Sequence, residues 1–181
     1  MNIVPICYYR SMGWPKQRIF LFLLGLFLLF PPLFSQANDP QSFTGKVVGI
    51  SDVDTIKVMR EGRAIKVRLH GIDCPEKKQP YGTKTKQFTS DMAFGNEVTV
   101  RIKDTDRYVR IVGEVILSDG ISLNKELVFV GLALWYRKYA PNDRTLKALE
   151  SGARAEKKGL WADENPIPPW EWRQGERGRS R

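Results

Sequence analysis

The sequence predicts an α+β fold, a small five-stranded antiparallel β-barrel with α-helices packed at its sides. Segments that alternate apolar and polar residues with a period of two, as strands with one buried face do, recur between residues 43 and 117. Segments with helical spacing and capping residues lie at 82–94 and after residue 122. The order shows no repeated β-α-β rhythm, which favours an antiparallel barrel over a parallel sheet.

Length, charge and cysteine content limit the possibilities further. The chain has 181 residues, a formal net charge of +9 and two cysteines, so we expect one domain with short appendages. A basic domain favours polyanionic partners such as nucleic acid or a membrane surface. Cys7 lies in an N-terminal segment that we expect to be removed, which leaves Cys74 without a partner for an internal disulfide. The domain therefore depends on its apolar core.

Residues 1–37 have the features of a secretory signal peptide. Three basic residues and no acid accompany the apolar run 19–30, and the small residues Ser35 and Ala37 suit a cleavage site after Ala37. Cleavage leaves 26 basic and 20 acidic residues, a net charge of +6. We therefore expect an exported protein, secreted or periplasmic. The alternative is a membrane anchor retained through residues 19–34, although a span usually needs about 20 apolar residues.

The rest of the chain is predicted to consist of a folded domain and a short tail. Residues 38–172 are predicted to form a single folded domain. Residues 173–181, which contain four arginines, are predicted to be a basic flexible tail, because chain ends are seldom ordered unless something holds them.

Five strands are predicted, at 43–50, 55–60, 64–69, 97–102 and 108–117. The short segment 60–63 between the second and third contains Gly62, which suits a hairpin turn. A hairpin folded there places Asp54 opposite a residue near Leu69, with Asp73 and Glu76 just beyond. The acids are therefore expected to converge at the open end of one hairpin.

Three helices are predicted. The first covers 82–94 and ends at Gly95. The second begins after Ser122, which can cap it, and runs to residue 130. The third begins after Asp143 and ends at Gly159. Residues 132–139 are expected to be extended.

The sequence contains few histidines and cysteines, which limits the kinds of catalytic and metal site that it can form. With one histidine and, after export, one cysteine, the domain lacks the residues for most nucleophilic triads and for the usual zinc sites. Carboxylate oxygens together with a backbone carbonyl are hard ligands that suit Ca²⁺ or Mg²⁺. Asp54 and Asp73 are the natural pair, and Asp52 lies in the same turn as Asp54.

A cation beside arginines suits the hydrolysis of a phosphodiester, in which charge accumulates on the phosphoryl oxygens and a base activates water. Glu76 is the candidate base, and Arg68 and Arg110 are candidates for bidentate hydrogen bonds to the phosphate. Each also has an ordinary interpretation as a turn acid or a solvated charge. Tyr108 and Tyr139 are either rim aromatics or platforms on which bases stack.

Several motifs occur in a characteristic order: Asp52-x-Asp54-Thr55, Val67-Arg68-Leu69 leading to Asp73-Cys74-Pro75-Glu76, Asp106-Arg107-Tyr108-Val109-Arg110, Leu123-Asn124-Lys125-Glu126-Leu127, Gly131-Leu132-Ala133, Tyr139-Ala140-Pro141-Asn142 and Lys158-Gly159-Leu160-Trp161. This series resembles the thermonuclease family typified by staphylococcal nuclease, over roughly residues 43 to 172. The closing segment 168–173 resembles the tail of exported bacterial members.

The resemblance implies an OB-fold barrel flanked by three helices. It also implies a Ca²⁺-dependent nuclease of low sequence preference that acts on single- and double-stranded DNA and RNA and leaves 3′-phosphates. We expect a monomer without a stable protein partner. By position, the implied roles are Ca²⁺ binding by Asp54, Asp73 and the backbone carbonyl of Cys74, support of that loop by Asp52 and Thr55, general base catalysis by Glu76, phosphate binding by Arg68 and Arg110, and lining of the nucleotide pocket by Tyr108 and Tyr139.

The sequence departs from the family pattern at two positions. Val53 and Val109 stand where the family usually has glycine, and a β-branched residue resists a positive φ. The alternative function is therefore a catalytically weakened OB-fold module that binds nucleic acid. A third possibility is a cell-envelope domain whose positive charge meets anionic lipid or polymer.

Overall fold

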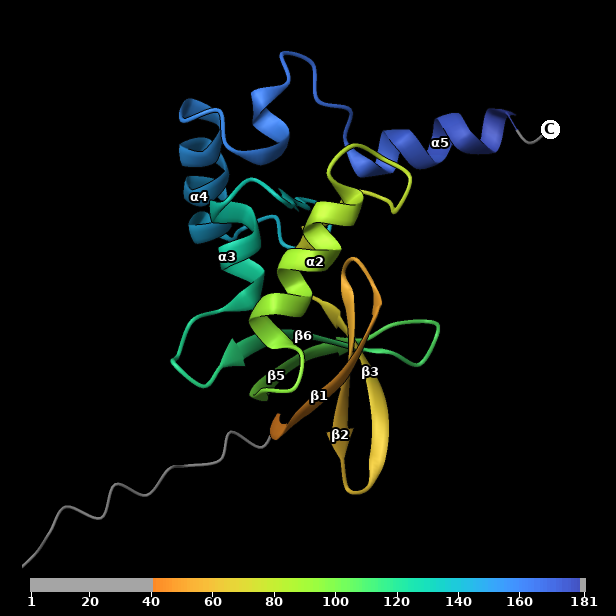
Figure 1. Cartoon of the computed structure of the whole chain (residues 1–181), viewed down its shortest axis with the longest axis vertical. Helices are drawn as coiled ribbons and strands as arrows, with labels where there is room; N and C mark the ends of the chain where they lie inside the picture. Colours follow the sequence, from red (N-terminus) through yellow and green to blue (C-terminus); the bar gives the residue numbers. More distant parts are fainter. Residues whose placement is uncertain (1–40, 180–181) are drawn as a thin grey trace, which may run out of the picture. The chain divides into compact units, whose positions relative to one another are not determined.

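The computed structural model describes residues 41–179, so the predicted signal peptide lies outside the described residues. Five strands close into a barrel in the order β1-β2-β3-β6-β5, drawn in the lower half of Figure 1. They are β1 (Ser42–Asp52), β2 (Thr55–Arg60), β3 (Arg63–Leu69), β5 (Glu97–Thr105) and β6 (Ile111–Leu117). The predicted five-stranded α+β barrel of the OB type is confirmed.

The barrel is mixed rather than wholly antiparallel. β3 and β6 pair in parallel, with Val67 beside Ile111 and Arg68 beside Val112, whereas the other neighbouring strands run antiparallel. The prediction of an antiparallel barrel is wrong at this closure, because alternation of side chains marks a strand but not its direction. The pairing brings Arg110, which precedes β6, beside the middle of β3.

The β2–β3 hairpin forms as predicted. Arg60 pairs with Arg63 across a two-residue turn, in which Glu61 and Gly62 have φ of 50° and 77°. Two positive φ values are typical of the hairpin turn that matches strand twist. At the other end, the Leu69 amide donates to the Asp54 carbonyl at 2.9 Å. Asp54 therefore lies where the hairpin prediction placed it.

The predicted helices appear as α2 (Gly82–Ala93), α3 (Leu123–Phe129) and α4 (Arg144–Ala155). The capping predictions hold, since the side chains of Ser122 and Asp143 accept hydrogen bonds from the Lys125 and Leu146 amides. A 3₁₀ turn, η1 (Gly159–Ala162), follows α4. Figure 1 shows α2 alongside the barrel and α3 and α4 beside each other.

Four segments differ from the predictions. α4 ends at Ala155 rather than at Gly159, which begins η1 instead. The strand predicted from residue 108 begins at Ile111, because 106–110 forms a turn. The extended segment predicted at 132–139 is a strand only at β7 (Leu134–Trp135), which pairs with β4 (Ile72–Asp73). The tail predicted to be flexible from residue 173 is helical as far as Arg179, as part of α5 (Pro169–Arg179). Contacts at the start of α5, described below, hold it.

The core fills the barrel and the space under α2, α3 and α4. Its fully buried members include Ile56, Val58, Val67, Leu69, Ile72, Val100, Val115, Leu123 and Leu127. Val53, from the β1–β2 turn, also belongs to this cluster. None of the described helices has the length and apolar character needed to cross a membrane.

Candidate functional site

Three carboxylates and two arginines meet beyond the open end of the β2–β3 hairpin. We call these five side chains the carboxylate cluster: Asp54, Arg68, Asp73, Glu76 and Arg173. Asp54 lies in the β1–β2 turn, Arg68 in β3 and Asp73 in β4. Four of the five were predicted from the sequence to lie together, and the structure places them together.

Arg68 bridges the two aspartates. One terminal nitrogen of its guanidinium lies 2.9 Å from Asp54 Oδ2 and 3.6 Å from Asp73 Oδ1. The other oxygen of Asp54 accepts a hydrogen bond from the Thr55 hydroxyl at 2.8 Å. Thr55 therefore contacts directly the aspartate that it was predicted to support. Asp52 caps the same turn, since its side chain accepts from the Val53 amide at 2.8 Å.

Arg173 joins Asp73 to Glu76. Its two terminal nitrogens lie 3.2 Å and 2.7 Å from the two oxygens of Asp73, and one of them also donates to Glu76 Oε1 at 2.8 Å. Burial alone lowers the pKa of Arg173, but the hydrogen bonds to both carboxylates outweigh it and raise the pKa. Arg173 is therefore fully charged in the site.

Asp73 is the most buried member, with no exposed side-chain area. Burial raises the pKa of its carboxyl group, and the hydrogen bonds and charge of Arg173 act in the opposite direction. The neighbouring Cys74 is a free, buried thiol whose pKa burial raises. Its side chain is therefore a poor ligand or nucleophile, which leaves only its backbone carbonyl for the role the resemblance implies.

Gln79 fixes the loop that carries Glu76. Its side-chain oxygen accepts from the Glu76 amide at 3.1 Å, and its own amide donates to the Glu76 carbonyl at 2.8 Å. Its side-chain nitrogen donates to the Ile167 carbonyl at 2.6 Å. Gly82, at the start of α2, lies so close to the Glu76 carbonyl that a Cβ atom there would collide with it. Glu76 is therefore held by backbone contacts while its side chain is 35% exposed.

The second group of predicted residues lies in the β5–β6 loop, residues 106–110. Asp106 organises it: its carboxylate accepts from the Tyr108 and Arg110 amides at 2.9 and 3.0 Å, and from Arg110 Nε at 2.7 Å. Burial raises the pKa of Asp106, but these hydrogen bonds prevail and lower it. Arg110 is thus paired with Asp106, and the structure shows no direct contact between it and the described residues of the carboxylate cluster.

The two valines behave differently. Val53 does not take a positive φ and packs its side chain into the core with 3% exposure. Val109 takes a φ of 59° and is 84% exposed. At Val53 the backbone needs no positive φ, so valine causes no strain there. Val109, in contrast, is held in the left-handed conformation that suits the glycine usual in the family.

The predicted aromatic residues are both exposed. Tyr108 is 63% and Tyr139 62% exposed. Tyr108 lies under the guanidinium groups of Arg107 and Arg110, at 4.8 and 5.4 Å from its ring centroid. Tyr139 contacts Tyr136 edge-on. Exposed rings beside cations suit the stacking of bases better than they suit a core.

The donor atoms fit a hard cation in type, because Asp54 and Asp73 each present a carboxylate oxygen to the same nitrogen of Arg68. In this structure those oxygens accept hydrogen bonds from guanidinium groups and from Thr55. Among residues 41–179, no three His, Cys, Asp or Glu side chains are arranged to hold an ion. Cation binding therefore requires the arginines to give up part of their pairing.

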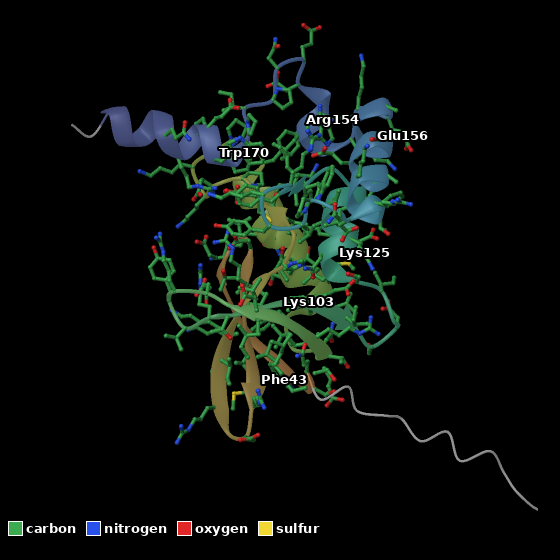
Figure 2. The ribbon with its side chains drawn as sticks, turned by 180° about the vertical axis from the view of Figure 1, so that it is seen from behind. Phe43, Lys103, Lys125, Arg154, Glu156 and Trp170 are labelled. Atoms are coloured by element: carbon green, nitrogen blue, oxygen red, sulfur yellow. The ribbon has the colours of Figure 1, made fainter. Side chains whose placement is uncertain are left out.

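A hollow of about 350 Å³ lies elsewhere, lined by His70, Lys103, Glu114, Lys125 and Asp143 among others. It contains none of the predicted site residues. Lys125 pairs with Glu114 at 2.8 Å, and Figure 2 shows Lys103 and Lys125 on this side of the domain. Its charges balance, so it shows no preference for an anionic ligand. Burial lowers the pKa of His70.

Sequence reasoning missed Arg173 and Gln79. Arg173 was assigned to a flexible tail, although it ends the segment 168–173 that carried part of the resemblance. The signal that was available was the pair Trp170 and Trp172 just before it, since two tryptophans are seldom left in a solvated tail.

Comparison with known proteins adds independent information. Residues 66–163 match the family model described as "Staphylococcal nuclease homologue". An "Uncharacterized endonuclease" of Escherichia coli is 43% identical over 129 residues, which cover 71% of this chain and 84% of that protein. Another of that name from Haemophilus influenzae is 39% identical over 158 residues, 87% of this chain and 86% of that protein. A "Micrococcal nuclease" of Shigella flexneri is 38% identical over 141 residues, 73% of this chain and 81% of that protein.

Proposed function

Because the chain belongs to the staphylococcal nuclease family, we propose that it is a calcium-dependent nuclease that hydrolyses phosphodiester bonds of DNA and RNA with low sequence specificity. The observation that carries the proposal is the meeting of Asp54, Asp73, Glu76 and Arg68 at the open end of one hairpin. Two acids for a cation, a third for a base and an arginine for a phosphate are the parts that this reaction needs.

Glu76 is the proposed general base. Its backbone is fixed by Gln79 and its side chain is partly exposed to solvent, so the carboxylate can hold a water molecule and take its proton as the water attacks phosphorus. The leaving group is the 5′ oxygen of the next nucleotide, so the products carry 3′-phosphates.

Arg68 and Arg110 are the proposed phosphate ligands. Arg68 lies on β3 and Arg110 directly precedes β6, which pairs with β3 at Val67 and Ile111. The two arginine side chains are 27% and 21% exposed. Planar guanidinium groups bind phosphoryl oxygens in bidentate fashion and stabilise the charge that develops on them. A bound Ca²⁺, held by Asp54, Asp73 and the Cys74 carbonyl, would supply further positive charge at the phosphate. Tyr108 and Tyr139 offer exposed rings for the bases on either side.

The test is digestion of single- and double-stranded DNA and of RNA, with Ca²⁺ or with chelator. We expect Glu76→Gln to lower the rate by about 10²–10⁴-fold, the usual contribution of a general base. The matched control is Glu61→Gln, which removes the same charge from the exposed far end of the hairpin and should leave the rate unchanged. Equal cleavage with chelator would remove the calcium role, and an undiminished rate in Glu76→Gln would remove Glu76 as the base.

A binding module without turnover is the alternative, favoured by the pairing of Arg110 with Asp106 and by the conformation of Val109. It predicts salt-sensitive binding of single strands with no product at any Ca²⁺ concentration.

We further propose that the protein is a monomer exported through residues 1–37. The charged flank, apolar run and small residues of the sequence support the export. Mass spectrometry of the protein recovered from the medium or periplasm is expected to show a chain that begins at Asn38. Recovery of the full-length chain in membranes would support the anchor instead.

A further inference from the structure

We propose that Arg173 is a functional residue of the site, acting as an internal cation that competes with Ca²⁺ for Asp73. This inference rests on the proposed function, because it concerns the cation of that site. Because Arg173 belongs to helix α5, this helix would control how tightly the site binds metal.

Arg173 occupies both oxygens of the Asp73 carboxylate. It lies 3.2 Å from Oδ1 and 2.7 Å from Oδ2, and Arg68 lies 3.6 Å from the same Oδ1. Ca²⁺ binds carboxylate oxygens at about 2.3–2.6 Å. A Ca²⁺ on Asp73 would therefore share an oxygen with a guanidinium group, and two positive charges would lie side by side with little water between them.

Arg173 also neutralises the negative charge of Asp73. Asp73 is fully buried, and a buried carboxylate needs a partner of opposite charge. Arg173 supplies that partner together with Arg68. A divalent cation would neutralise Asp73 equally well. Arg173 is therefore expected to reduce the affinity of Asp73 for a cation, and a bound cation to reduce its affinity for Arg173.

Helix α5 is attached to the domain at its first turn. Figure 2 shows Trp170 where α5 meets the domain, with the helix extending away from it. The Trp170 ring stacks on Tyr136 at 5.4 Å with an interplanar angle of 4°, and the Ile167 carbonyl just before α5 accepts from Gln79. A helix attached by its first turn can release Arg173 by a small local movement while the barrel stays intact.

The experiment is calorimetric titration of the chain with CaCl₂ alone. We expect Arg173→Gln to bind Ca²⁺ about 10-fold more tightly than the wild type, within the range of coupling between two sites. The matched control is Arg63→Gln, which removes the same charge from the exposed far end of the hairpin and should change affinity by less than about 2-fold, because charges this far apart are screened.

Two further variants separate competition from a general effect of charge. Trp170→Ala keeps the charge of Arg173 but removes the stacking contact that docks α5, so competition predicts tighter Ca²⁺ binding and a simple charge effect predicts none. Arg173→Lys keeps the charge but has no planar fork for Asp73, and is expected to lie between the wild type and Arg173→Gln.

Hydrogen exchange gives a readout independent of activity. Saturating Ca²⁺ is expected to speed exchange of the backbone amides in α5 of the wild type, because Arg173 is displaced. Unchanged exchange, or a Ca²⁺ affinity of Arg173→Gln equal to or weaker than that of the wild type, would overturn the inference. If either occurs while the wild type still cleaves nucleic acid only with Ca²⁺, the proposed function stands alone. If neither the wild type nor Arg173→Gln binds Ca²⁺, the competition and the calcium role fall together.

Discussion

The β1–β2 turn and the β5–β6 loop both carry a valine where the family usually has glycine, and they accommodate it in opposite ways. Val53 avoids the left-handed conformation and adds its side chain to the core. Val109 accepts that conformation in solvent, with nothing to gain from burial. The first turn positions Asp54 and the second positions Arg110, so the two sides of the proposed site differ in how firmly they are built.

The difference shows where a substitution for glycine can be stabilising. At Val53, burial of the side chain offsets the loss of glycine's freedom. At Val109 the left-handed conformation of a β-branched residue costs about 1–2 kcal/mol of stability. The hydrogen bonds that Asp106 accepts in the same loop offset this cost. The turn that carries the proposed metal ligand Asp54 is therefore stabilised by the core, whereas the loop that carries the proposed phosphate ligand Arg110 depends on the Asp106 carboxylate.

The largest effect on stability is expected for Val53→Gly. Loss of a buried side chain and the added freedom of glycine in the unfolded chain should lower the free energy of unfolding by about 3 kcal/mol. Urea unfolding followed by circular dichroism measures it. A loss below about 1 kcal/mol would show that Val53 is not a core residue, and the comparison between the two turns would fail.

The next effect is expected for Asp106→Ala. Removing the acceptor for two backbone amides and for Arg110 should cost about 1–2 kcal/mol of stability and leave Arg110 without a fixed orientation. The rate of cleavage should fall as well, since misplacement by about 1 Å costs on the order of 100-fold. The control is Asp104→Ala, whose carboxylate accepts only from the neighbouring Thr105 amide among the described contacts.

A smaller effect of opposite sign is expected for Val109→Gly. Relief of the left-handed conformation, less the extra entropy of glycine in the unfolded chain, should stabilise the protein by about 1 kcal/mol. In a protein of this size that raises the melting temperature by about 2–4 °C. Scanning calorimetry beside Val53→Gly tests the contrast, because the same replacement must stabilise in one turn and destabilise in the other.

The smallest effect is a pH dependence that Asp106 contributes. The folded state lowers the pKa of Asp106 below its unfolded value of 3.8. The unfolded state therefore binds protons first as pH falls, so the stabilisation is complete above that value and is lost as pH drops through the folded pKa. Unfolding at pH 7 and pH 3 should show that Asp106→Asn differs from the wild type more at the higher pH.

Most of the fold was accessible from the sequence because each element carries a local signal. Alternation marked the strands, and Gly62, Ser122 and Asp143 marked a turn and two helix starts that the structure confirms. The hairpin register placed Asp54 near Asp73 without any information on tertiary structure. The parallel pairing of β3 with β6 carried no such signal, because it depends on how the barrel closes.

The site was only partly accessible for the same reason. Arg68, Asp73 and Glu76 are close in sequence, so local reasoning brought them together. Arg173 reaches Asp73 across 100 residues, and its neighbours offer no strand or helix pattern that leads to the site. Gln79 carried no signal in the sequence, since its three hydrogen bonds involve backbone groups that sequence does not display.

The parallel closure of β3 on β6 also has a meaning for the folding pathway. Antiparallel hairpins form from neighbouring residues, whereas the contact between Val67 and Ile111 must close a long loop and is expected to form late. A chain that has folded only its first hairpin already has Asp54 and Arg68 in place but lacks Arg110 beside them. The complete set of charges that we propose to surround a phosphate therefore exists only once the barrel has closed, so a partly folded chain is expected to be unable to cut nucleic acid.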